Sequence, residues 1–176
     1  MSEGCEFYVG NKIVRKMFYF LFFAFLPFLF IFFIYIQYPL SGILNEIVSK
    51  VINLPAIYSS KSPAFSRVMS LYLKTAPAFA IVFFLFSFKL LKLKKGSVFS
   101  QAISVLVLFT LFYVILIYIF LFTNTNLTAS VKILAFMSKN DIYLSFFYVT
   151  LYSGIYILSF LYLWFCIGTY RLFKER

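Results

Sequence analysis

Residues 17–36 decide the fold class, and they read MFYFLFFAFLPFLFIFFIYI. Twenty helical residues rise about 30 Å, which matches the hydrocarbon thickness of a bilayer. Three later stretches are similarly apolar, namely residues 75–91, 102–122 and 143–167. The sequence therefore predicts an all-α integral membrane protein with four transmembrane helices, in a single domain that comprises residues 1–176.

The composition supports this class and excludes much chemistry. Of 176 residues, 64% are hydrophobic and only 12% are charged, about half the usual charged share of a soluble domain. The chain has no histidine and five acidic residues, and none of these acids lies in the middle of a predicted span. Histidine-ligated zinc or haem, catalytic triads and intramembrane proton relays are therefore excluded, so we expect no cofactor, no metal site and no enzymatic activity.

Basic residues set the expected orientation. Ten of the sixteen flank the termini and the short segment between spans two and three: Lys12, Arg15, Lys16, Lys89, Lys92, Lys94, Lys95, Arg171, Lys174 and Arg176. The positive-inside rule places this side in the cytoplasm and the other two loops on the outer side of the membrane. Topology signals beside anionic lipid explain these clusters better than nucleic-acid binding, so no nucleic-acid partner is expected.

Both outer loops carry helical patterns. From Pro39 to Ile52 apolar residues recur three and four positions apart, which predicts an amphipathic helix on the outer membrane surface. Ser62-Pro63 is typical of a helix start, and that helix continues into span two. The second loop predicts a short helix around residues 127–135, and Asn140 is placed to cap span four.

Small residues spaced four apart are the candidate contacts within the lipid. Span two contains Ala76 and Ala80, and span four contains Thr150 and Gly154. Such pairs let helices approach closely, either within the protein or with a helix of another membrane protein, and internal packing is favoured for any single residue. Several hydroxyls are also placed to bond across helices: Ser87, Thr110, Ser145, Thr150, Ser153 and Ser159.

Two charges lie near the outer ends of the predicted spans. Lys74 precedes the second span, where a lysine can extend to lipid headgroups. Asp141 lies at the start of span four, where a negative charge stabilises the positive end of a helix. The two residues form an ion pair if their helices are neighbours.

Several short motifs together resemble a known family. They are Leu54-Pro55-Ala56-Ile57-Tyr58-Ser59-Ser60, Val68-Met69, Tyr72, Lys74-Thr75-Ala76-Pro77, Asn124, Leu127-Thr128-Ala129, Asn140-Asp141, Phe147-Tyr148 and Leu151-Tyr152-Ser153. In this order and spacing the chain resembles the immunity proteins that protect bacteria against pore-forming colicins of the A, B, N, U and Y group. It departs from them at Asn126, where an acidic residue is expected, and at Ala129-Ser130, which lacks the expected glycine.

The resemblance implies a function and partners. Such a colicin inserts an apolar helical hairpin from the periplasmic side, and the membrane potential then drives further helices across to open a pore. The chain is expected to bind this pore-forming domain within the phospholipid bilayer and to keep the channel closed. The candidate partner-binding residues are Lys74, Thr75, Ala76, Pro77, Ala80, Asp141, Thr150 and Gly154.

Two other classes of function stay open. A small transporter or channel component is one alternative, although it would require an intramembrane carboxylate or a charged pore face, and the sequence shows neither. A structural subunit of a larger membrane complex is the other.

Overall fold

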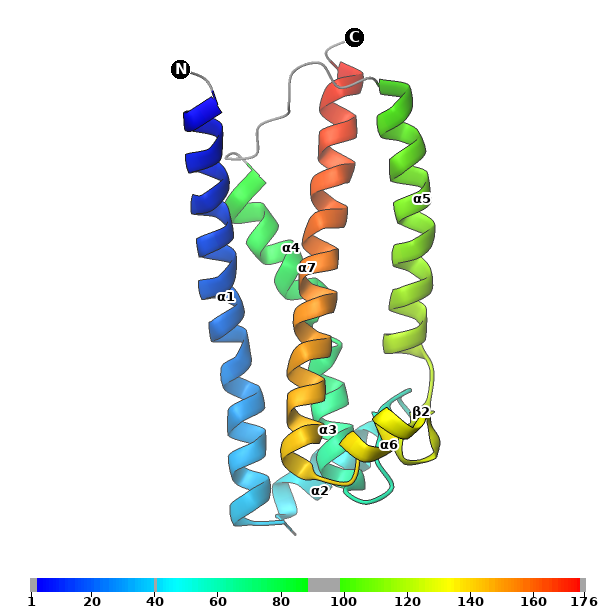
Figure 1. Ribbon diagram of the computed structural model, residues 1–176. Helices are drawn as coiled ribbons and strands as arrows, with labels where there is room; N and C mark the ends of the chain where they lie inside the picture. Colours follow the sequence, from blue (N-terminus) through cyan, green and yellow to red (C-terminus); the bar gives the residue numbers. More distant parts are fainter. Residues whose placement is uncertain (1–2, 40, 89–98, 175–176) are drawn as a thin grey trace.

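The computed structural model describes residues 3–39, 41–88 and 99–174. It consists mostly of helices, and the long ones have roughly aligned axes (Figure 1). Both chain termini lie at the same end. Four helical segments are long and apolar enough to cross a membrane: Lys12–Gln37, Pro63–Ser87, Ser100–Phe122 and Asp141–Lys174. The prediction of four such helices is confirmed, whereas membrane insertion stays a prediction. We call the end opposite the termini the loop end.

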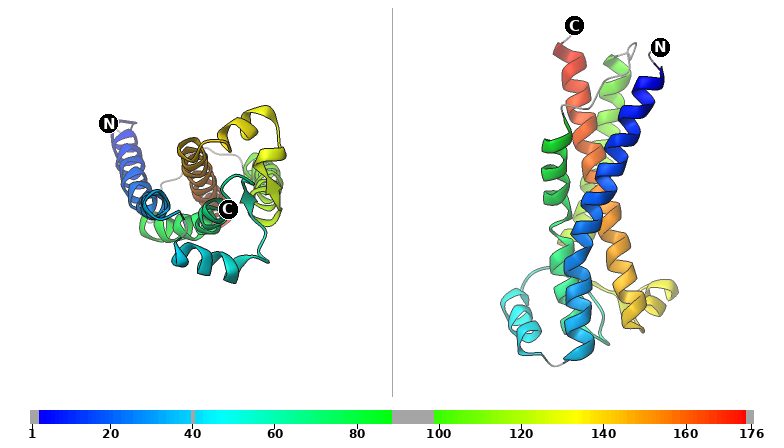
Figure 2. Two further views of the ribbon diagram at one scale, coloured as in Figure 1. Left: turned by 90° about the horizontal axis from the view of Figure 1, so that it is seen from below. Right: turned by 90° about the vertical axis from the view of Figure 1, so that its left-hand side faces the viewer.

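The three longest helices form most of the bundle. Helix α1 covers Glu3–Gln37 without ending at Pro27, and α7 covers Asp141–Lys174. Helix α5 covers Phe99–Ile117 and is extended by a wider π-type turn, Tyr118–Phe122. In Figure 1 α7 stands between α1 and α5, and α3 and α4 lie behind it, which the view from below in Figure 2 also shows.

Span two is two helices and not one. Helix α3 covers Pro63–Leu73 and α4 covers Ala76–Ser87, so the span begins well before the predicted start at Thr75. The predicted end of this span, residues 89–91, lies outside the described residues. The two helices differ in direction, because α4 slants away from the upright α3 (Figure 1).

Pro77 explains this break. It has no N–H group with which to continue the bonding pattern of α3, so the helix ends before it. The chain turns more tightly instead, and the Thr75 N–H group bonds to the Tyr72 carbonyl at 2.9 Å. Pro77 itself lies in the first turn of α4, where the loss of an N–H group costs little.

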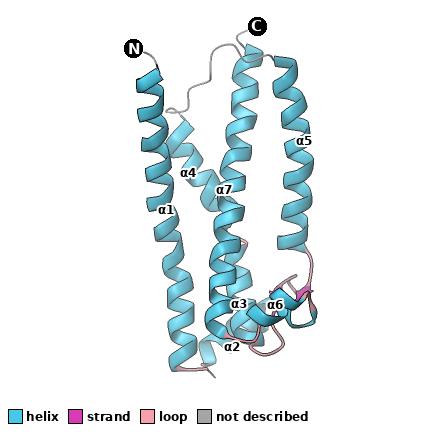
Figure 3. Cartoon of the chain, viewed as in Figure 1, coloured by secondary structure: helices cyan, strands magenta, loops and turns pink. Residues whose placement is uncertain are grey.

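The loop end carries the shorter elements, which Figure 3 separates by type. Helix α2 covers Gly42–Val51, and Ser41 caps it by accepting a hydrogen bond from the Leu44 N–H group at 3.2 Å. The second loop contains a 3-10 turn, Leu127–Ala129, and helix α6, Lys132–Met137. Helical segments therefore occur in both loops, but those of the second loop are separated at Ser130 and Val131 and do not form one helix. Amphipathic helices at the outer membrane surface stay a prediction.

Two short strands were not predicted. Strand β1, Ile57–Tyr58, pairs in parallel with β2, Thr125–Asn126. Ile57 is paired with Thr125, and Tyr58 with Asn126. This pair joins the two loops at the loop end.

Aromatic rings fill the core between α1, α3 and α7. The rings of Tyr72 and Tyr152 stack with their centroids 5.4 Å apart and their planes at 1°. Phe28 meets both of them edge-on, at 4.8 Å and 5.3 Å. The Tyr72 hydroxyl donates a hydrogen bond to the Ala24 carbonyl of α1 at 2.8 Å, so this polar group is satisfied inside the bundle.

Helix α5 packs mainly against α7. The rings of Tyr113 and Tyr162 stack at 4.5 Å, and the Tyr113 and Ser159 hydroxyls share a hydrogen bond of 2.9 Å. Ser159 thus confirms one of the predicted bonds between helices. Three other hydroxyls with that prediction bond to the carbonyl four residues earlier in their own helix, and they are Thr110, Ser145 and Ser153.

Candidate partner-binding site

A buried hydrogen-bond network organises the loop end. Ser59 is its centre and is fully buried. Its N–H group donates to Ser66 Oγ at 3.0 Å, and its hydroxyl donates to the Ser138 carbonyl, also at 3.0 Å. Next to it, the Ser60 N–H group donates to Thr128 Oγ1 at 3.1 Å. These bonds connect the first loop to α3 and to the second loop.

Polar groups of the first loop also bond to distant parts of the chain. The Ala56 N–H group donates to Asn124 Oδ1 at 2.9 Å, and the Ile57 N–H group donates to Ser70 Oγ at 3.0 Å. The Tyr148 hydroxyl of α7 donates to the Ile57 carbonyl at 2.7 Å. Motifs that are scattered along the sequence therefore meet at one place, and their shared role is to hold the loops in a fixed shape.

The sequence contained one signal for this network that was missed. Ser62, Ser66 and Ser70 recur every four residues and so share one face of α3. Ser66 and Ser70 are almost fully buried. A stripe of hydroxyls on an otherwise apolar helix indicates buried polar partners, because an unpaired hydroxyl inside a protein is costly.

Asp141 and Lys74 do not pair. Asp141 Oδ1 accepts a hydrogen bond from Ser62 Oγ at 2.5 Å, whereas Lys74 lines a small hollow beside Arg67. The considered ion pair is therefore wrong, because the two side chains line different hollows. The predicted cap is confirmed, since Asn140 Oδ1 accepts a bond from the Ile142 N–H group at 2.9 Å.

Five candidate residues lie at or after the break in span two. Lys74, Thr75 and Pro77 are half-buried in the turn itself, and the Thr75 hydroxyl donates to the Tyr72 carbonyl at 2.7 Å. Ala76 and Ala80 have no exposed surface and belong to the core cluster. An approaching partner meets the chain's own helices before it can reach these two alanines.

The other small pair lies on an open surface. Thr150 and Gly154 are exposed, and a Cβ atom added at Gly154 would meet nothing within 4 Å. Ile142 and Phe146 continue the same four-residue spacing and are exposed as well. We call these four residues the open α7 face. The opposite side of α7 is buried, with Tyr148, Tyr152 and Tyr156 in the core.

This face suits a helix better than a small molecule. Gly154 and Thr150 allow close approach of a second backbone, and the flanking Phe146 supplies apolar contact area. Asp141 begins the helix just before this face, so the α7 members of the candidate set lie along one helix. Span two packs against α7, but its two candidate alanines are buried and so do not contribute to the exposed surface that Thr150 and Gly154 form.

The fold and this site define a small helical protein with four helices long and apolar enough to span a membrane, one of which has an exposed face with small residues. The chain belongs to the colicin immunity protein family, because the model of that family matches residues 40–176. It is 32% identical to the colicin-A immunity protein of Citrobacter freundii over 166 residues, which is 94% of this chain and 93% of that protein.

Two further relatives come from Escherichia coli. The colicin-N immunity protein is 38% identical over 64% of this chain and 89% of its own length. The colicin-B immunity protein is 32% identical over 78% of this chain and 79% of its own length. No solved structure matches the chain.

Proposed function

We propose that the chain protects a bacterial cell by binding the pore-forming domain of a colicin in the inner membrane, so that the channel does not open. The observation that carries this proposal is family membership, together with four helices that can span a membrane. The relatives that support it are named as immunity proteins for colicins A, N and B. In this proposal the chain acts by binding the toxin and catalyses no reaction.

The open α7 face is the proposed contact for the toxin. Its partner would be an apolar helical hairpin, which has to pack against exposed helix surface within the lipid. Thr150 and Gly154 offer that surface, whereas Ala76 and Ala80 are buried. Asp141 and the loop end lie next to this face, and they would contact the part of the toxin nearest the periplasm.

The energetic demand on this contact can be bounded. Each elementary charge that crosses 100 mV gains about 2.3 kcal/mol, so the membrane potential favours the open toxin. A shift of the toxin from mostly open to mostly closed requires a difference in binding free energy of about 5.5 kcal/mol between the two states. An immunity protein must therefore bind the closed state selectively. The open α7 face would do so by packing against the helical hairpin of the closed toxin.

The proposed orientation predicts the outcome of reporter fusions. Both termini would lie in the cytoplasm, and the loop end would lie in the periplasm, because basic residues flank the termini. Alkaline phosphatase fused after Ser60 or Asn126 is expected to be active, and fused after Arg176 it is expected to be inactive. An active phosphatase at the C-terminal position would contradict this topology.

Expression of the chain is expected to protect sensitive cells against one pore-forming colicin or a few. The measurement is the toxin dose that kills half of the cells, for a panel of pore-forming and nuclease colicins that share receptors. Nuclease colicins should kill as before, because their action does not depend on a voltage-driven hairpin. Equal protection against both groups would indicate blocked uptake and would refute the proposal.

A further inference from the structure

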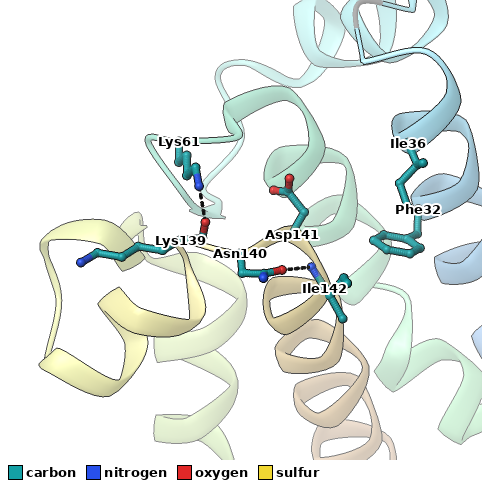
Figure 4. A pocket seen from close by; sticks show the side chains of 7 residues that line it. All are labelled: Phe32, Ile36, Lys61, Lys139, Asn140, Asp141 and Ile142. Carbon is teal, nitrogen blue, oxygen red and sulfur yellow. Dashed lines mark hydrogen bonds between the residues drawn. The ribbon is translucent and has the colours of Figure 1, made fainter.

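A hollow of about 350 Å³ lies at the loop end between α1 and the start of α7 (Figure 4). Helix α1 contributes Phe32 and Ile36, the loop before α3 contributes Lys61, and the start of α7 contributes Asn140, Asp141 and Ile142. One wall is therefore apolar and the others carry charge. We call it the Lys61–Asp141 hollow.

The hollow holds two opposite charges that do not pair with each other. Asp141 is half-buried, and one of its oxygens, Oδ1, accepts the hydrogen bond from Ser62. The Lys61 ammonium donates to the Lys139 carbonyl and not to a carboxylate. Within the described residues, neither Asp141 nor Lys61 has an ion-pair partner. The hydrogen bond from Ser62 uses only Oδ1, so a bound ammonium could add a charge-assisted hydrogen bond to this carboxylate.

The directions of the side chains narrow the chemistry of the ligand. In Figure 4 the Lys139 ammonium points away from Asp141, so Lys61 is the cation that remains available at the hollow. Phe32 points from α1 towards the start of α7. A fitting ligand carries an ammonium group for Asp141, an anionic group for Lys61 and an alkyl chain for Phe32 and Ile36.

We infer that the Lys61–Asp141 hollow binds the headgroup of phosphatidylethanolamine. The primary ammonium would donate to Asp141, the phosphodiester would lie at Lys61, and an acyl chain would lie along Phe32 and Ile36. These two residues belong to the last turns of an apolar helix that ends at Gln37, so in a bilayer they would lie where headgroups meet hydrocarbon. This inference does not depend on colicin binding.

The headgroup chemistry distinguishes this lipid from its relatives. Phosphatidylglycerol has no cation for Asp141, and the trimethylated ammonium of phosphatidylcholine has no proton to donate. Free phosphoethanolamine also carries an ammonium and a phosphate, although its monoester phosphate has about two negative charges at pH 7 where the phosphodiester has one. It has no acyl chain, so it leaves Phe32 and Ile36 without a partner. The chemistry of the hollow therefore favours the intact lipid.

Native mass spectrometry of the full-length chain in detergent tests this inference. The protein is incubated with equal amounts of phosphatidylethanolamine and phosphatidylcholine that carry the same acyl chains. We expect about tenfold preference for phosphatidylethanolamine, as one charge-assisted hydrogen bond can supply. Asp141→Asn keeps an oxygen that can accept the bond from Ser62 but removes the charge, so the preference should fall to about one.

Two matched variants separate charge from structure. Ser62→Ala removes the hydrogen bond to Asp141 and keeps its charge, so the preference should remain. Lys61→Gln changes an exposed residue, and it should weaken retention of both lipids severalfold without altering the preference between them. Lys61→Gln removes the side-chain bond to the Lys139 carbonyl but none of the side chains in the buried network around Ser59. If Asp141→Asn lowers the yield of folded protein, the weaker lipid retention of Lys61→Gln therefore still tests whether the hollow holds the headgroup.

Three results would overturn the inference. The first is equal retention of the two lipids by the unmodified chain, and the second is an unchanged preference in Asp141→Asn. The third comes from thermal unfolding with millimolar free phosphoethanolamine, where stabilisation as large as that by the lipid would assign the site to a soluble phosphate ester. If Asp141→Asn loses protection against colicin but keeps its lipid preference, the hollow belongs to the toxin contact instead.

Discussion

Gly154→Leu is expected to weaken protection against the cognate colicin strongly, while the amount of protein in the membrane stays the same. Gly154 lies on the open α7 face, and a Cβ atom added there meets nothing within 4 Å beyond its own stretch of helix. Leucine is well tolerated in lipid and favours helix more than glycine does, so folding should not suffer. A toxin helix that packs on this face would be pushed away, at a cost of about 1–3 kcal/mol, or roughly 5- to 150-fold in protective strength.

The measurement is toxin survival together with membrane abundance for each variant. Ser104→Leu is the matched control, because Ser104 is an exposed small residue on α5, and its hydroxyl bonds only to the Ser100 carbonyl of the same helix. Gly154→Ala should give an intermediate loss. If protection falls only in proportion to the amount of protein, or if Ser104→Leu is equally harmful, the open α7 face is not the contact.

Ala80→Leu is expected to act in the opposite way, by lowering the amount of folded protein. Ala80 has no exposed surface, and it belongs to the same core cluster as Phe83 and Tyr156. A leucine at this position overfills a packed interior, which typically costs about 1–3 kcal/mol. The expected result is a lower midpoint of thermal unfolding in detergent and a reduced yield from membranes.

Val82→Leu serves as its control, since Val82 is exposed on the same helix and the change adds one carbon to a lipid-facing surface. Any residual Ala80→Leu protein should still protect cells, molecule for molecule. A stable Ala80→Leu protein that fails to protect would mean that the toxin reaches the α4 side of the bundle, and the contact would have to be moved there.

The sequence predicted the number of spanning helices well, because long apolar runs have few alternatives in a membrane protein. Their ends were less predictable. Helix α7 continues to Lys174, beyond the predicted end at residue 167, because a helix can continue past the hydrocarbon into polar surroundings. The start of span two at Pro63 was missed, because α3 carries a stripe of serines and its sequence is too polar to be recognised as part of a membrane span.

The inward face of each helix could not be predicted. In a soluble protein polar residues mark the outside of a helix, but lipid accepts apolar side chains on every side. The pairs Ala76/Ala80 and Thr150/Gly154 therefore look alike in sequence, although one is buried and the other is exposed. The strands were missed for a different reason, since two residues are too few to show alternation.

The pairing of β1 with β2 has a consequence for the time course of synthesis. Ala56 and its partner Asn124 are 68 residues apart, so a ribosome needs roughly 3–14 s to deliver the second after the first. During that interval the first loop has no partner from the second loop, although α1, α3, α4 and α5 are synthesised before Asn124. The growing chain thus passes through a stage in which up to three of its four span-length helical segments exist without a complete loop end. Ribosome-stalled chains that end before and after Asn124 should differ sharply in how readily a protease cuts at Ser60.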